Sequence, residues 1–429
     1  MLRKRTIIIF AIITATAYFA VHAFTAQWVM VFLSLFFLFV GSVLLHSYLE
    51  FSQKIEGKKW NSFPFVSVLV PNYNGEKHVG KCLSSIKKLE YPKNKIEIIV
   101  VDDASTDKSS AIIKKFSGIK LIQQKKNMGK ARALNTALKQ AKGEFVACID
   151  SDTYPDSDSL KKMIEMFDSK EIGAVTGLIR VHNPHNLLMR IQQLEYLIGF
   201  GFYQSMLSLI NAAFVTPGPM SVYRKKCLVD AGGYDENNIT EDMGVALQLQ
   251  YNGCRIKARH DASIYTEVPE NWKAWLRQRL RWYRGKIFNT IKFREMFLNP
   301  KFGDLGFFSL PFSFFLEISS VFALFVFAIL AMQNAEIMLR SILAWASIST
   351  FPAIKILPPL VNSSVLFTYS TLIFIFLFTL TASHKIAGEK LGLKKILPII
   401  SIMAFYSMAV AGVWLYSMFK EINKSEYKW

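Results

Sequence analysis

Long apolar runs at both ends of this 429-residue chain constrain its fold most strongly. Two runs lie at the N-terminus, at residues 6–24 and 28–48, and four lie near the C-terminus, at residues 307–332, 337–357, 365–382 and 396–419. About 20 apolar residues are enough for a helix to cross a bilayer. We therefore expect two membrane helices in residues 1–50, three or four in residues 306–420, and one soluble domain between them.

The charges around the first run predict its orientation. A secretory signal peptide also begins with basic residues such as Arg3, Lys4 and Arg5, but this run is long for a signal core and a second run follows it. Basic residues mark the cytoplasmic side of membrane helices. We therefore expect a multi-pass plasma-membrane protein whose N-terminus and central domain are cytoplasmic.

The number of C-terminal helices depends on the second run, which contains Arg340, Pro352 and Lys355. If it spans, the chain has six membrane helices, and the basic loop around residues 385–395 lies outside. If it is re-entrant or interfacial, the chain has five, and that loop lies inside. We favour six.

The composition indicates a basic membrane protein. The net charge is +19 and 52% of the residues are hydrophobic. Lysines and arginines of such proteins meet anionic lipid headgroups. We expect membrane lipids and no nucleic acid as partners, because no nucleic-acid motif accompanies the charge. The four cysteines lack metal or disulfide spacing, as expected for reduced core residues.

The central domain, residues 54–284, alternates β-branched runs with helical stretches. We expect strands at residues 66–70, 96–101, 119–123 and 145–149, and helices at residues 76–89, 109–116, 131–141 and 157–167. Buried strands alternating with helices predict a mostly parallel, helix-covered α/β sheet. Ligands on such sheets bind beyond the carboxyl ends of the strands.

Candidate ligand-binding residues occupy these strand ends. Pro71 to Asn74 follow the first strand, Asp102 and Asp103 the second, and Asp150 and Asp152 the fourth. Acids here can bind a nucleobase or ribose, although Asp103 can also simply cap the next helix. Two aspartates one residue apart can share a divalent cation with a diphosphate, although acidic pairs are also common at ordinary strand exits.

Three downstream patterns complete the candidate site. Asn127 to Lys130 combine a glycine turn with a lysine, which suits a diphosphate at a helix N-terminus but also fits an ordinary turn. Thr240-Glu241-Asp242 offers a general base, or merely acids at a helix start. The run from Gln278 to Trp282 offers an amide, an anion clamp and a flat ring. It also fits a helix that lies on the membrane surface. We expect an interfacial amphipathic region to follow it, at residues 285–305.

Taken in order, these motifs resemble those of the processive inverting family-two glycosyltransferases, the group of cellulose, chitin, hyaluronan and poly-N-acetylglucosamine synthases. The resemblance runs from about Val66 to Gly285 and includes the flanking membrane helices. It implies a Rossmann-like GT-A nucleotide-sugar domain. The first loop departs from the family pattern, because Gly75 follows Asn74 where a glutamate is usual.

The resemblance implies a role for each candidate residue. Asp242, with Glu241 beside it, provides the catalytic base that deprotonates the acceptor hydroxyl. Asp152, together with Asp150, binds Mg²⁺ or Mn²⁺. The donor nucleotide contacts Pro71, Tyr73, Asp102, Asp103, Lys130 and Asp150. The acceptor and the leaving diphosphate contact Gln278, Arg279, Arg281 and Trp282.

Three functions remain open at this stage. The first is a synthase that extends and exports a β-linked polysaccharide, using a UDP-sugar that we expect to be UDP-N-acetylglucosamine or a related UDP-hexose. The second is a single transfer to a lipid-linked acceptor, and the third is an inactive nucleotide-sugar sensor. A small accessory membrane subunit is a further partner that the resemblance leaves open.

Overall fold

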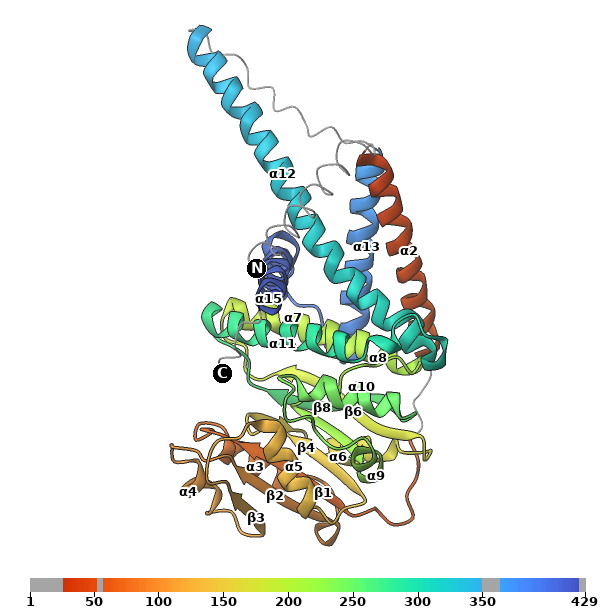
Figure 1. Cartoon of the computed structure of the whole chain (residues 1–429), viewed down its shortest axis with the longest axis vertical. Helices are drawn as coiled ribbons and strands as arrows, with labels where there is room; N and C mark the ends of the chain where they lie inside the picture. The colour runs from red at the N-terminus through yellow and green to blue at the C-terminus, as the bar shows by residue number, and fades with distance from the viewer. Residues whose placement is uncertain (1–25, 52–56, 349–362, 424–429) are drawn as a thin grey trace. The chain divides into compact units, whose positions relative to one another are not determined.

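The structure is a computed structural model, in which residues 26–51, 57–348 and 363–423 are described (Figure 1). The chain divides into two compact units. The first is helical and draws on α2 (Ala26–Phe51), α12 (Leu310–Ile348), α13 (Ser363–Ile386) and α15 (Ser407–Ile422). The second, residues 47–313 with 379–403, contains the β-sheet. The expected first membrane helix, residues 6–24, lies outside the described residues.

The second unit is built on an eight-stranded sheet with the order β3-β2-β1-β4-β7-β6-β8-β5. The strands are β1 (Val66–Asn72), β2 (Ile96–Asp102), β3 (Ile119–Gln123), β4 (Phe145–Ile149), β5 (Thr153–Pro155), β6 (Ile172–Val181), β7 (Met220–Arg224) and β8 (Arg255–Thr266). Strands β1 to β4 are parallel neighbours, as the sequence predicts, whereas β7 runs antiparallel between β4 and β6. The sheet is therefore a mixed α/β sheet of GT-A type.

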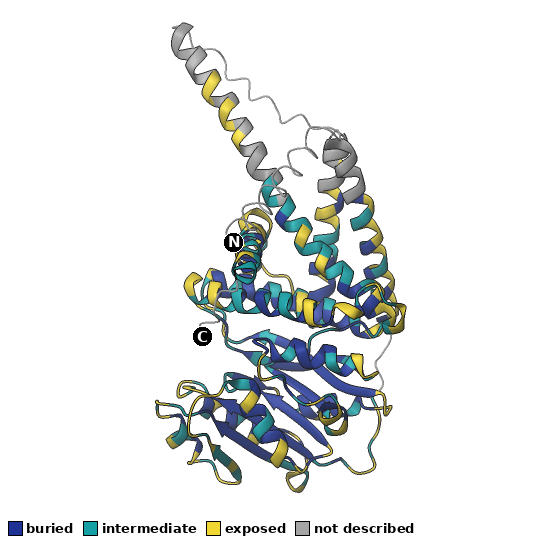
Figure 2. Cartoon of the chain, viewed as in Figure 1, coloured by how far each residue is buried: buried dark blue, intermediate teal, exposed yellow. Residues whose placement is uncertain are grey.

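Both faces of this sheet are buried, as Figure 2 shows for its central strands. In β1, Val68 and Val70 pack into one hydrophobic core, while Leu69 packs into the other. Successive side chains of a strand point to opposite faces, so continuous apolar runs indicate a sheet covered on both sides. The first core contains α3 (Val79–Lys87) and α6 (Ser159–Glu165), and the second contains α5 (Lys130–Gln140) and α10 (Glu241–Tyr251).

The remaining helices of this unit connect the strands or follow the sheet. They are α4 (Ser109–Ile113), α7 (Leu187–Tyr196), α8 (Gln204–Leu209), α9 (Lys225–Asp230), α11 (Trp272–Lys292) and α14 (Ile396–Ser401). The π-helical turn Leu197–Tyr203 joins α7 to α8. The sequence predicts an interfacial helix region at residues 285–305, but α11 begins 13 residues before residue 285 and ends at Lys292. Short 3-10 turns at Arg294–Met296 and Pro300–Phe302 follow it.

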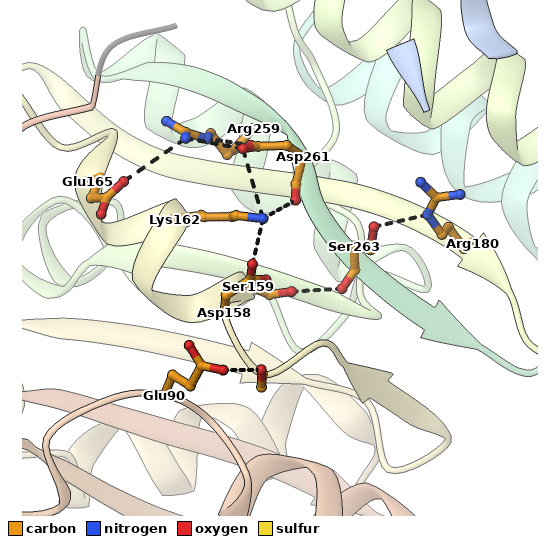
Figure 3. Close-up of polar contacts among 10 residues, drawn as sticks. Glu90, Asp158, Ser159, Lys162, Glu165, Arg180, Arg259, Asp261 and Ser263 are labelled. Atoms are coloured by element: carbon orange, nitrogen blue, oxygen red, sulfur yellow. Dashed lines mark hydrogen bonds and ion pairs between the residues drawn. The ribbon is translucent and has the colours of Figure 1, made fainter. Parts of the chain in front are cut away.

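A polar network attaches α6 to β8 (Figure 3). Lys162 pairs with Asp158 at 2.6 Å and donates to the carbonyl of Asp261 at 2.9 Å. Arg259 pairs with the Asp261 carboxylate at 2.5 Å. These groups satisfy one another, so we interpret this network as structural.

Helix α12 continues without a break at residues 332–337 from the apolar run at residues 307–332 into the next run as far as Ile348, and residues 349–357 of that run lie outside the described residues. The intervening Gln333-Asn334-Ala335-Glu336 contains no glycine or proline, so the backbone can remain helical. After α13, Glu389 pairs with Arg180 of β6 at 2.5 Å, and Arg180 also donates to the carbonyl of Ala387. The basic loop therefore lies against the sheet domain. The side of the membrane on which this loop lies, and with it the choice between five and six membrane helices, stays a prediction.

Three helices of the described part of the chain are long and apolar enough to cross a membrane. They contain the segments Ser34–Phe51, Leu305–Phe322 and Leu393–Ile422, and a shorter apolar helix covers Ser370–Ile386. These helices correspond to the expected apolar runs, so the membrane character expected from the sequence agrees with the described helices.

Candidate active site

The ends of β1 and β2 form one side of the candidate site. Tyr73, directly after β1, is 51% exposed, so its ring is accessible to a planar ligand. Pro71 and Asp102 are buried. Asn72 donates to the Asp102 carboxylate at 3.1 Å, and the Ser105 hydroxyl donates to the same oxygen at 2.5 Å. These bonds fix the position of Asp102 at the strand end.

Asp103 holds the loop that precedes α5. Its carboxylate accepts hydrogen bonds from the backbone N–H groups of Met128 at 2.9 Å and Gly129 at 2.8 Å. Gly129 has a φ of 89°, a conformation that glycine adopts without strain. The contact joins residues 25 positions apart, so Asp103 does not simply cap the helix that follows it. It positions the turn that presents Lys130.

Lys130, the first residue of α5, joins two distant acids. Its Nζ lies 2.6 Å from Asp150 Oδ1 and 2.8 Å from Glu241 Oε1. Burial alone would lower the pKa of Lys130, but the charges of Asp150 and Glu241 outweigh it and raise that pKa above its usual range. The ammonium therefore stays charged and brings the end of β4 close to the start of α10.

Asp242 lies in the first turn of α10 beside this ion pair. Its carboxylate accepts a hydrogen bond from the Met243 backbone at 2.8 Å, and the Thr216 hydroxyl donates to its carbonyl at 2.8 Å. Burial and the adjacent Glu241 charge raise the pKa of Asp242 to about 6. Burial also opposes ionisation of Glu241, but Lys130 and Arg281 lower its pKa. Asp242 is thus the acid of this pair that more readily accepts a proton.

A pocket brings these residues together. It is lined by Lys130, Leu134, Cys148, Asp150, Thr216, Pro217, Gly218, Tyr223, Tyr234, Glu241 and Asp242. Its wall at Gly218 depends on the absence of a side chain, because a Cβ there would lie 2.6 Å from Lys130 Nζ and 2.7 Å from Asp150 Oδ2. In the sequence, Gly218 is recognisable only as part of a rigid turn between two prolines. Its close approach to the Lys130–Asp150 ion pair depends on the tertiary structure.

Asp150 and Asp152 fit a divalent cation chemically. Burial and the neighbouring Asp150 charge raise the pKa of Asp152 to about 6, so a cation would relieve repulsion between the two carboxylates. Within the described ranges, no group of three or more His, Cys, Asp and Glu side chains is arranged to hold a metal. Hard cations commonly complete their coordination with water and substrate phosphate, which two protein carboxylates leave room for.

A second charged group beside Asp152 is not predicted by the sequence analysis. The Tyr154 hydroxyl donates to Glu267 at 2.9 Å, and His182 Nδ1 lies 3.1 Å from the same carboxylate oxygen. The backbone N–H of Glu267 reaches the Asp152 carbonyl at 3.3 Å. These contacts attach His182 to the turn that carries Asp152.

The Gln278–Trp282 run lies within α11, and its two arginines have different surroundings. Arg281 donates to the Ile239 carbonyl at 3.4 Å and acts electrostatically on Glu241. Arg279 is fully buried and pairs with Glu195 of α7 at 2.5 Å. Residues two apart on an α-helix point in nearly opposite directions, which separates the two side chains. The direct diphosphate contact expected for Arg279 stays a prediction.

Trp282 packs beside Arg279 and α7. The Arg279 guanidinium lies 4.1 Å from the centroid of the Trp282 ring, and the Tyr196 ring centroid lies 6.3 Å away. Gln278 accepts a hydrogen bond from Arg279 at 2.6 Å. Arg279 therefore holds both Gln278 and Trp282. The sequence motif alone does not reveal this arrangement.

Part of the chain matches a known protein family and known proteins in sequence. Residues 67–230 match the glycosyl transferase family 2 model. A poly-beta-1,6-N-acetyl-D-glucosamine synthase of Staphylococcus epidermidis is 35% identical over 257 residues, which cover 57% of this chain and 60% of that protein. The Staphylococcus aureus (strain COL) protein of the same name is 32% identical over 278 residues, covering 63% and 66%. The matches thus span less than two thirds of these relatives.

One solved structure supports the fold. A mannosyltransferase of Pyrobaculum calidifontis, solved in complex with GDP-Man and Mn²⁺, aligns with a TM-score of 0.53 at 18% identity. The alignment covers 92% of this chain and all of that one. At this identity, the likeness concerns the fold of the chain.

Proposed function

We propose that this chain, whose residues 67–230 form a glycosyl transferase family 2 domain, is a membrane-embedded inverting glycosyltransferase that extends a β-linked polysaccharide. The donor is UDP-N-acetylglucosamine or a related UDP-hexose. The observation that carries the proposal is the junction of Lys130, Asp150, Glu241 and Asp242 in one pocket, with Arg281 acting on its acids. The names of the staphylococcal relatives support the choice of sugar.

Donor binding uses the groups at the strand ends. Tyr73 offers its exposed ring to the uracil base, and Asp102 and Asp103 lie beside the nucleoside. Lys130 faces the diphosphate, where a fixed ammonium attracts phosphate oxygens. Arg281 neutralises charge on the departing UDP. Asp102, Asp103 and Lys130 are held by hydrogen bonds and ion pairs of the fold before the donor arrives, which limits the entropy lost on binding.

Asp150 and Asp152 would hold Mg²⁺ or Mn²⁺. When bound, such a cation neutralises the negative charge that develops on the diphosphate as the glycosidic bond to the sugar breaks. The raised pKa of Asp152 and the absence of a third described protein ligand suit a cation shared with the donor.

Transfer requires one base on the side of the acceptor. Asp242 removes the proton from the acceptor hydroxyl, whose oxygen attacks the anomeric carbon opposite the diphosphate. The new C–O bond forms as the bond to UDP breaks, and this single displacement inverts the configuration. A base with a pKa near the working pH combines sufficient ionisation with sufficient basicity, and Asp242 meets that condition. Glu241 stays ionised and orients Lys130.

Processive extension and export follow from the proposed placement in the membrane. The acceptor ring would stack on Trp282, since aromatic faces bind sugars without requiring one hydroxyl pattern. We place the chain in the plasma membrane with its catalytic domain in the cytoplasm, where nucleotide sugars are available. A single transfer to a lipid-linked acceptor remains the alternative outcome of the test below.

The test uses purified full-length protein in lipid nanodiscs with Mn²⁺ or Mg²⁺. UDP- and GDP-sugars are supplied one at a time, and nucleotide release and product length are measured in the same reaction. A ladder of products from UDP-N-acetylglucosamine, absent in the Asp242→Asn variant, is the expected result. A single product length would indicate the lipid-linked alternative, whereas donor binding without turnover with either metal would indicate a sensor.

A further inference from the structure

One face of α11 contacts the segment that leads into α10. The contacts come from Arg281, Gly285, Asn289 and Lys292, which are spaced by four, four and three residues. This spacing places them in one stripe along the helix. Their partners all lie within residues 235–240, directly before Glu241 and Asp242. The stripe therefore joins the helix of the Gln278–Trp282 run to the start of the helix that carries the proposed base.

The centre of the stripe is a reciprocal amide pair. Asn238 Nδ2 donates to Asn289 Oδ1 at 2.7 Å, and Asn289 Nδ2 lies 3.3 Å from Asn238 Oδ1. Asn289 Nδ2 also reaches the Thr240 hydroxyl at 3.0 Å and the Gly285 carbonyl at 3.0 Å. Asn289 is fully buried, and Asn238 is 4% exposed. A buried amide left without these partners would carry a large desolvation cost, so the pair strongly favours one alignment.

Two glycines allow the close approach that this pair requires. A Cβ on Gly285 would lie 2.2 Å from Thr240 Oγ1, and a Cβ on Gly244 would lie 2.3 Å from Asn238 Nδ2. No side chain fits at either distance. The two helices therefore meet at a position set by the absence of side chains and the presence of one amide pair.

Weaker contacts extend the stripe at both ends. Arg281 donates to the Ile239 carbonyl at 3.4 Å, and Lys292 pairs with Asp235 at 2.8 Å. Lys292 is exposed, so solvent screening weakens its ion pair. The buried amide pair between these ends therefore dominates the alignment.

We propose that Asn289 is a positioning residue, which sets the distance between the base Asp242 and the diphosphate-facing Arg281 without touching either substrate. This inference rests on the proposed function. Asn289 lies eight residues, or about 12 Å, along α11 from Arg281. Its effect passes through Asn238 and the residues that follow it. A displacement of about 1 Å at a reacting group can lower a rate about 10²-fold.

The first test compares Asn289→Ala with Asn252→Ala. Asn252 is the matched control, because it follows the other end of α10, is exposed, and bonds the Asp230 carbonyl at 3.2 Å. We expect Asn289→Ala to lower kcat for transfer by about 10- to 100-fold while leaving the KM for the donor unchanged. Asn252→Ala should match the unmodified protein. Equal losses in both variants, or a raised KM with normal kcat, would overturn the proposal.

A double-mutant comparison tests the pair itself. If Asn238 and Asn289 act through each other, the rate loss of the variant that carries both alanines should be smaller than the product of the two single losses. Rate losses that multiply would show that the two residues act independently, which contradicts the proposed pair.

Hydrogen exchange tests the alignment without any enzymatic reaction and so separates this inference from the proposed function. The Thr240 N–H donates to Asn238 Oδ1 at 3.0 Å, and the Gly244 N–H donates to the Thr240 carbonyl at 3.1 Å. Asn289→Ala should speed exchange at both amides and leave α5 unchanged, even in a protein that transfers no sugar. Unchanged exchange at both amides would refute the role.

Should Asn289→Ala fail to fold, Lys292→Ala offers a milder change at the exposed end of the same stripe. We expect a smaller but measurable increase in exchange at residues 235–240. Because the buried amide pair dominates the alignment, exchange identical to that of the unmodified protein would overturn the contribution assigned to the Lys292 ion pair.

Discussion

The rate of sugar transfer should depend on pH through Asp242. Burial and the Glu241 carboxylate raise the pKa of Asp242 to about 6 from the usual 3.8. A general base works only when ionised, so activity should increase as the pH rises through this pKa and fall below it. Lys130 and Arg281 oppose the rise in the pKa of Asp242, since their positive charges favour its carboxylate form.

The size of the effect follows from the ionised fraction. With a pKa of about 6, about a tenth of Asp242 is ionised at pH 5 and about nine tenths at pH 7, so kcat/KM should rise about tenfold. With an unperturbed pKa near 3.8, Asp242 would be almost fully ionised at both pH values, and the rate would stay nearly constant. The two cases differ enough to be separated by initial rates.

Asp152 has a similarly raised pKa, so a second variant must identify the titrating group. Glu241 exerts the largest charge effect on the pKa of Asp242, whereas the charges that act most on Asp152 are those of Asp150, Lys130 and Glu267. Glu241→Gln removes a negative charge beside the base, so the pKa of Asp242 should fall. The acidic limb of the pH–rate profile, where the rate rises with pH, should therefore move to lower pH. Glu236→Gln is the matched control, because this exposed acid pairs with Arg132 and should leave the limb in place.

The assay measures UDP release coupled to polymer formation between pH 5 and pH 8 at saturating Mn²⁺. A rate that is constant from pH 5 to pH 7 would refute the role of Asp242 as the titrating base. A limb that moves equally in Glu241→Gln and Glu236→Gln would refute the electrostatic cause assigned to it.

Three further predictions concern the proposed roles of single residues. Asp242→Asn should retain nucleotide binding and lower transfer by about 10²–10⁴-fold, as seen in parallel binding and turnover assays, and normal product formation would exclude it as the base. Asp152→Ala should abolish the dependence of donor binding on Mn²⁺, and an unchanged titration would exclude it as a ligand. Trp282→Ala should shorten products more than it slows UDP release, whereas Arg281→Ala should reduce both. If Trp282→Ala reduced product length and UDP release equally, while Arg281→Ala released UDP normally, these separate roles of Trp282 and Arg281 would be contradicted.

Much of the fold is readable in the sequence because its signals are local. The runs at residues 66–70 and 145–149 contain few polar side chains, and continuous burial on both faces of a parallel strand requires such runs. Asp102 follows the run at residues 96–101 directly and Asp150 follows the run at residues 145–149, so knowing where the strands end is enough to place both acids at one edge of the sheet.

Helix boundaries near the membrane are less readable. Apolar runs determine which residues can enter a bilayer, but not where one helix ends and the next begins. Gln333 to Glu336 interrupt the apolar pattern without breaking α12, because polar residues other than proline and glycine cost a helix little.

The arrangement of the site depends on tertiary structure. The sequence identifies Lys130, Glu241 and Arg281 as candidates, but residues more than 100 positions apart become neighbours only when the strand order is set. That order places β7 beside β4, brings Gly218 against Asp150, and leaves room for Lys130 to bridge two acids.

The two arginines of the Gln278–Trp282 run show most clearly what the sequence determines and what only the tertiary structure decides. Their types and spacing are properties of the sequence, and so is the helix that contains them. Only the packing of α11 against α7 and against residues 235–240 determines that Arg279 pairs with Glu195 while Arg281 faces the acids. Sequence periodicity fixes which side chains share a face of a helix, whereas the partner of each face depends on contacts between distant segments, which local patterns do not encode.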